Sequence, residues 1–153
     1  MSYVQRVLQP NETLLYSTRL HWLIFGRPIL LLVLALAAAE AASQIGSVVR
    51  LALWAAAAGL VLLGVLNGIG AALRRASTEF AVTDHRVIYK RGLIGRYTVE
   101  MARSKVESVD VVQSVLGRVF NYGTILVRGT GGSLEPFRTV EDPLRLRSAI
   151  IAS

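Results

Sequence analysis

The stretch Leu51–Leu73, LALWAAAAGLVLLGVLNGIGAAL, contains 23 consecutive residues without a charge. As an α-helix it would rise about 34 Å, which is enough to cross a bilayer core of about 30 Å. It ends at the pair Arg74-Arg75, and such pairs favour the cytoplasmic side of a membrane. The stretch therefore predicts a membrane-spanning helix, and the alternating segments that follow it predict a small separate domain.

A second apolar segment, Trp22–Ala39, precedes this span. Arg27 and Pro28 lie near its start, where an arginine side chain can reach the interface and a proline fits the first helical turn. The connection Glu40–Arg50 is short and weakly polar. Residues 22–74 are therefore expected to form a helical hairpin, between an N-terminal arm of residues 1–21 and a domain of residues 75–153.

The arginines give the hairpin a direction. The flanks carry Arg6, Arg19, Arg27, Arg74 and Arg75, whereas the connection carries only Glu40 and Arg50. Positive flanks stay in the cytoplasm, so both termini are expected there. A competing interpretation is a signal peptide with its apolar core at 29–39 and cleavage near Ala39-Glu40-Ala41. Its flanks fit poorly, because 21 residues that include Glu12 precede the apolar region.

Small residues recur every four positions on the second span, at Gly64, Gly68 and Ala72, with Asn67 nearby. Such a face permits close helix contact. It would pack either on the first span of the same chain, which we favour, or on a second copy.

The domain after the spans has the pattern of an antiparallel sheet. Apolar residues alternate with polar ones, or Val, Ile, Tyr and Thr predominate, in five stretches, and a sixth contains Pro136, which indicates an edge strand. The stretches are 78–83, 86–91, 96–101, 106–113, 124–128 and 134–138. Asp142-Pro143 is typical of a helix start, and a final helix would bury Leu146 and Ile150. The fold class is α+β.

Four stretches resemble the bacterial pleckstrin-homology-like domains that follow two membrane spans, a family long catalogued as a domain of unknown function. They are Phe80–Gly92, Val111–Arg118, Ile125–Val127 after Tyr122-Gly123, and Phe137–Pro143. The resemblance implies a PH-like barrel of about seven strands with a capping helix. It also implies a role in membrane-associated binding rather than catalysis, often with self-assembly, at the bacterial inner membrane.

The residues themselves offer little chemistry. Cysteine is absent and the two histidines are His21 and His85, so no metal-ligand spacing occurs. Asp84-His85 is better explained as a turn than as a catalytic pair, because no nucleophile accompanies it. Gly129–Ser133 lies between strands and lacks the lysine and helix of a phosphate loop. We expect no catalytic residue, no cofactor and no nucleic-acid partner.

Two groups of residues are candidates for binding. The net charge is +7, and a basic cluster of Arg86, Lys90, Arg91 and Arg96 could contact lipid headgroups or be a solvated edge. Apolar residues in connections, namely Leu93, Ile94, Val115, Leu116 and Phe120, could contact a partner or the bilayer. The leading hypothesis is a membrane-anchored, non-enzymatic scaffold that binds a membrane protein complex or self-assembles. The alternative is a sensor of anionic lipid.

The predicted topology can be tested directly, because the chain contains no cysteine that would interfere. Cysteines introduced at Ser43 or Ser47 should react with a membrane-impermeant maleimide added outside intact cells, since the connection is expected on that side. Ser153→Cys should react only after permeabilisation. Labelling of Ser153→Cys from outside would contradict the topology.

Overall fold

The structure, a computed structural model, describes residues 4, 7–46, 48–92, 95, 97–130 and 134–152, with the backbone alone at 134 and 135. The chain divides into two compact units. One, the strand unit, contains Met1–His21 together with Arg74–Ser153, and the other, the helical unit, contains Trp22–Leu73. The N-terminal arm therefore belongs to the same unit as the C-terminal half of the chain.

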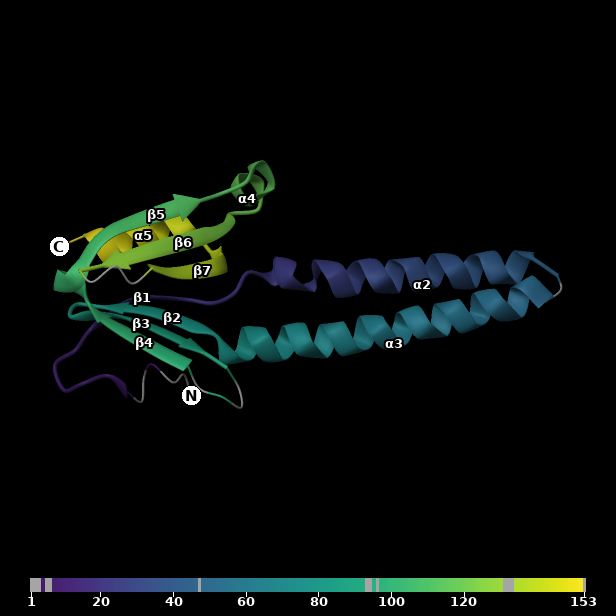
Figure 1. Ribbon diagram of the computed structural model, residues 1–153, viewed down its shortest axis with the longest axis horizontal. Coiled ribbons are helices and arrows are strands. Elements are labelled where there is room, and N and C mark those ends of the chain that lie inside the picture. Colours follow the sequence, from purple (N-terminus) through teal and green to yellow (C-terminus); the bar gives the residue numbers. More distant parts are fainter. Residues whose placement is uncertain are drawn as a thin grey trace. The chain divides into compact units, whose positions relative to one another are not determined.

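The helical unit is a hairpin of α2 (Gly26–Gln44), preceded by the short 3₁₀-helix η1 (Trp22–Phe25), and α3 (Val48–Ser77). The two long helices lie side by side (Figure 1). Both are long and apolar enough to cross a membrane, judged by length and composition. Both helices extend into the expected connection Glu40–Arg50, α2 to Gln44 and α3 from Val48, because alanine, glutamate and arginine near its ends favour helix.

The strand unit contains two antiparallel sheets (Figure 1). The first sheet, in the order β1-β2-β3-β4, consists of β1 (Leu14–Thr18), β2 (Glu79–Thr83), β3 (Arg86–Arg91) and β4 (Tyr97–Ala102). The second, in the order β5-β6-β7, consists of β5 (Val106–Val112), β6 (Tyr122–Gly129) and β7 (Leu134–Glu141). The expected α+β class is confirmed, and Pro136 lies on the edge strand β7 as expected.

The expected closed barrel is not what the structure shows, because both sheets are open. Between β4 and β5 the short helix η2 (Arg103–Lys105) replaces sheet pairing. On the other side, a single bridge in the described residues, Leu20↔Val140, joins the arm to β7. Thr139, next to that bridge within β7, has a φ of 56°, a conformation that is uncommon for a β-branched residue.

The core lies between the two sheets. Phe80, Val82, Val87 and Tyr89 point into it from the first sheet, and Ile125, Val127 and Phe137 from the second. Tyr89 and Phe137 meet across the core with ring centroids 4.6 Å apart. Alternate residues of β2 and β3 explain this arrangement, because side chains of a strand point to opposite faces in turn.

The final helix α5 (Pro143–Ile151) contacts strands of both sheets and buries Leu146 and Ile150, as the sequence predicted. Asp142 is the N-cap residue and Pro143 follows it at the helix start, as expected, but the side-chain cap is absent. Asp142 adopts a left-handed conformation. Its carboxylate instead lies 3.7 Å from Arg145, while its backbone carbonyl accepts a bond from Leu146.

The outer face of the first sheet is also covered. Ala81 and Ile88 point away from the main core and pack with Val4 of the N-terminal arm. The arm then runs through β1 and donates a bond from the His21 N–H to the Thr139 carbonyl at 2.8 Å. The arm therefore contacts both sheets before the chain enters the helical unit.

Replacing Ile150 with aspartate should destabilise the strand unit by about 3 kcal/mol or more, because Ile150 is 5% exposed and an unpaired charge would be buried. Ile151→Asp is the matched control, since Ile151 is 52% exposed. Urea-dependent proteolysis of the full chain in detergent measures both. Equal unfolding midpoints would show that α5 is not docked as described.

The contacts of the N-terminal arm lead to a second prediction, which concerns the stability of the strand unit without the arm. A fragment of residues 75–153 lacks β1 and should not unfold cooperatively, because the edge of β2 and the face containing Ile88 lose their cover. Residues 1–21 joined to 74–153 by a long Gly/Ser linker should restore a cooperative transition, measured by circular dichroism. A cooperative fragment 75–153 would show that the arm is dispensable.

Candidate functional site

Arg86 is the centre of an ion-pair network on the first sheet. Its Nε and Nη2 atoms donate to the two carboxylate oxygens of Glu12 at 2.8 and 2.6 Å. Nη1 donates to Glu100 at 2.7 Å, and Nη2 also reaches the Val7 carbonyl at 3.0 Å. Four contacts therefore hold the Arg86 guanidinium, which the sequence had suggested as a ligand for a lipid headgroup.

Glu12 is the buried partner, with a side chain only 2% exposed. The hydrogen bonds from Arg86, helped by those from the Gln9 N–H and the Thr83 hydroxyl, outweigh burial and lower the pKa of Glu12 from 4.5 to about 2. The reciprocal bonds raise the pKa of Arg86. This geometry is that of a structural clamp between the arm and β3.

The remaining members of the basic cluster do not gather around Arg86 as one site. Lys90 is half-buried on β3, on the same face as Arg86, whereas Arg91 is exposed at the end of that strand. Arg96 lies outside the described residues, as do Leu93 and Ile94. Among the cluster members that the structure describes, Arg91 is thus the one that is exposed.

The turn Asp84-His85 serves the fold in a similar way. The Asp84 carboxylate accepts a bond from the Thr13 N–H at 3.1 Å and lies 3.3 Å from His85 Nδ1. Asp84 thereby fixes the turn to the arm. In the described part of the chain, no group of three or more His, Asp or Glu side chains is placed to hold a metal ion.

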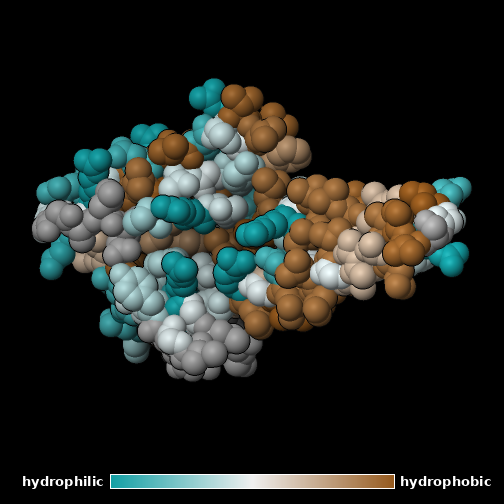
Figure 2. Space-filling view, turned by 45° about the vertical axis from the view of Figure 1, so that its right-hand side comes forward, coloured by the Kyte–Doolittle hydropathy of each residue, from teal (hydrophilic) through white to brown (hydrophobic). Residues whose placement is uncertain are grey.

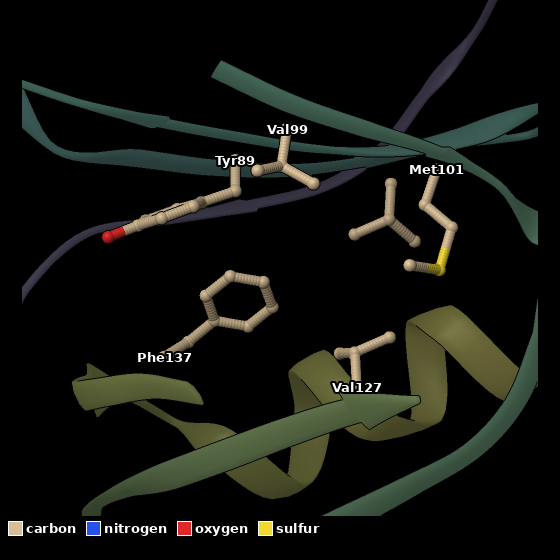
Figure 3. Close-up of a pocket in the computed structure, with 6 residues that line it drawn as sticks. Tyr89, Val99, Met101, Val127 and Phe137 are labelled. Atoms are coloured by element: carbon tan, nitrogen blue, oxygen red, sulfur yellow. The ribbon is translucent and has the colours of Figure 1, made fainter. Parts of the chain in front are cut away.

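A cavity in the core is too small for a ligand. Its volume is about 10 Å³, and it lies between Val87, Tyr89 and Met101 of the first sheet and Val127 and Phe137 of the second (Figure 3). A single water needs about 10–15 Å³ and several polar partners. The cavity is lined by apolar side chains, so it is a packing defect rather than a binding site.

The connection predicted to be irregular contains a short helix, α4 (Val115–Val119). Its outward side chains are strongly exposed: Val115 is 79%, Leu116 61% and Val119 71% accessible, and Phe120 follows at 43%. Figure 2 shows hydrophobic side chains gathered over α4 at the top of the view. Three of the five residues predicted to form a contact surface, Val115, Leu116 and Phe120, therefore lie together on one exposed element.

The small-residue face of the hairpin packs within the chain at two of its predicted positions. A Cβ atom at Gly64 would lie 2.9 Å from Leu32 Cδ2, and one at Gly68 3.7 Å from Pro28 Cβ. Ala72 is exposed, and the buried alanine is Ala71. Asn67 donates to the Leu63 carbonyl of its own helix at 2.8 Å rather than across the hairpin.

A strand unit of two antiparallel sheets with a C-terminal helix, joined to an apolar helical hairpin, defines a small domain of the pleckstrin-homology class. The family model described as bacterial PH domain matches residues 28–153, and the chain belongs to that family. No curated protein and no solved structure matches the chain.

Sequence reasoning did not identify the clamp. Glu12 and Arg86 are 74 positions apart, and nothing in the local pattern of either residue indicates the pairing. The one available signal was that Glu12 is the sole acidic residue of a basic arm. The clamp lies partly outside the matched family region, because Glu12 precedes residue 28.

The clamp predicts an acid-sensitive strand unit. Because the pKa of Glu12 falls from 4.5 to about 2 on folding, its contribution of about 3 kcal/mol is present above pH 4.5 and is lost as the pH falls toward 2. Glu12→Gln should destabilise the chain at pH 7 and flatten this part of the pH profile, whereas Glu107→Gln, at an exposed site, should not. Unfolding midpoints between pH 7 and 2.5 measure the effect, and parallel profiles for Glu12→Gln and wild type would exclude the clamp.

Proposed function

We propose that this protein is a non-enzymatic binding or scaffold module of the bacterial PH domain family, anchored in the inner membrane by α2 and α3, with both termini in the cytoplasm. Its partner is a membrane protein complex or further copies of the chain. Family membership supports the binding role, and two helices of suitable length and composition support the anchor.

The observation that carries the proposal is that the strand unit joins both helices at one of its ends. β1 ends at Thr18, which pairs with Phe80 near the start of β2. The chain therefore leaves the strand unit after His21 and returns before Glu79 at the same edge. A domain joined in this way presents one end to the membrane and leaves its other surfaces accessible to a cytoplasmic or membrane-bound partner.

The association can be tested by purifying the full chain in a mild detergent. Light scattering coupled to size-exclusion chromatography should give a mass above that of one chain after correction for detergent, or a partner should co-purify in a fixed ratio. A strictly monomeric protein without a partner would contradict the scaffold proposal. Such a result would leave the membrane anchor to be decided by cysteine labelling.

Sensing of anionic lipid remains the second hypothesis, and it rests on the positive charge of the chain. Arg86 already binds two carboxylates, so a headgroup site would have to depend on Lys90, Arg91 and Arg96. An Arg86→Gln variant would break the clamp as well as remove a charge. Any test of lipid sensing should therefore change Lys90, Arg91 and Arg96 and leave Arg86 in place.

A further inference from the structure

We propose that α4 inserts Val115, Leu116 and Val119 into the interfacial layer of the bilayer that holds the chain's own apolar helices, and thereby orients the strand unit on the membrane. The proposal rests on the membrane anchor proposed above. It assigns the exposed apolar surface of α4 to lipid rather than to a protein partner.

The fold of α4 does not depend on its apolar side chains. The Ser114 hydroxyl accepts a bond from the Gly117 N–H at 3.0 Å, which begins the helix. The Gln113 amide donates to the carbonyls of Gly117 and Tyr122 at 3.3 and 3.1 Å. Polar and backbone contacts thus hold α4 in place.

Gly117 forms the inward surface of this helix. A Cβ atom there would lie 2.7 Å from the Tyr122 carbonyl oxygen, so only glycine permits the close approach. The valine and leucine side chains consequently point outward, where the core gains nothing from them. Exposed apolar residues on a rigid, well-bonded element are typical of a contact surface.

The position of α4 within the strand unit favours a membrane contact. Tyr122, three residues after the end of α4, lies beside His21 with ring centroids 5.4 Å apart. Trp22, which follows His21 in the chain, begins the first apolar helical segment. α4 therefore lies at the end of the strand unit from which the chain enters the proposed membrane anchor.

The size and charge of the α4 surface also favour lipid. A standard protein interface takes about 20–30 residues a side, whereas α4 offers a few apolar side chains on five helical residues. Arg118, exposed on the same helix, provides a cation for lipid phosphates. Apolar side chains next to a basic residue are the composition of elements that lie in a membrane interface.

Site-directed fluorescence on the full chain tests this assignment, because the chain has no native cysteine. Leu116→Cys is labelled with a nitrobenzoxadiazole dye and reconstituted into vesicles of phosphatidylethanolamine and phosphatidylglycerol. Ile151→Cys is the matched control, since Ile151 is also apolar, helical and exposed at 52%. The carbonyl of the preceding residue, Ile150, accepts a bond from Arg103, and the Arg103 N–H donates to the His85 carbonyl. These contacts place residue 151 at the end of the strand unit opposite to α4.

We expect lipids with a nitroxide near the headgroup to quench the dye at residue 116 several-fold more than at residue 151, and aqueous iodide to show the reverse order. Equal iodide quenching at both sites would overturn the proposal, because α4 would be in water. Protection from iodide without lipid quenching at residue 116 would also overturn it, because α4 would then pack on a second copy.

Two further variants separate the possible causes of failure. A dye at Leu62→Cys on α3 should be quenched by nitroxides deep in the acyl chains; if it is not, the anchor itself is wrong and the α4 proposal falls with it. A dye at Val115→Cys should lose most of its lipid quenching when Leu116→Ser and Val119→Ser are added. Unchanged quenching in that variant would show that these side chains do not hold α4 in the bilayer.

Discussion

The strand unit depends on the pairing of Arg86 with Glu12. The carboxylate is 2% exposed, and a charge buried to that extent is tolerated only with full hydrogen bonding. Glu12 meets this requirement with two bonds from Arg86 and one each from Gln9 and Thr83. Removing either partner leaves the other charge desolvated, so the pair specifies where the arm docks even if an apolar pair could be equally stable.

The docked arm makes the apolar hairpin an insertion within the strand unit. Residues before and after the hairpin pair directly, with Thr18 opposite Phe80 and Leu20 opposite Val140. Contacts of such long sequence separation form late in folding, because the intervening loop must first be closed. A hairpin already folded in a membrane would shorten this search, since it brings its two ends together. In the proposed arrangement the anchor would assist the folding of the domain that it tethers.

The elements predicted correctly are those whose pattern is local. The Val-Ile-Tyr run in Arg86–Arg91, which follows the Asp84-His85 turn, identified β3 with its observed bounds, and the uncharged run at Leu51–Leu73 identified most of α3. β1 gave no such signal, because Leu14 and Leu15 are both exposed while Thr18 is buried, which no alternation predicts. α4, at five residues, is shorter than a helix that propensity alone can specify. Barrel closure depends on pairing between strands far apart in the sequence, which no local pattern predicts, and the left-handed Thr139 beside the Leu20–Val140 bridge is not expected of a β-branched residue.

The structure changes the interpretation of two residues that the sequence had suggested as binding residues. Arg86 is a cation that the sequence suggested for a lipid headgroup, yet its donors are occupied by two carboxylates and a carbonyl, and it stabilises the fold. Leu116 is an apolar residue of the kind that usually fills a core, yet it is 61% exposed on a helix held by Ser114 and Gln113. In this domain, exposed apolar side chains therefore indicate a contact surface better than charge does. The guanidinium of Arg86 has already exchanged most of its water for protein oxygens, whereas an exposed leucine would lower its free energy by leaving water.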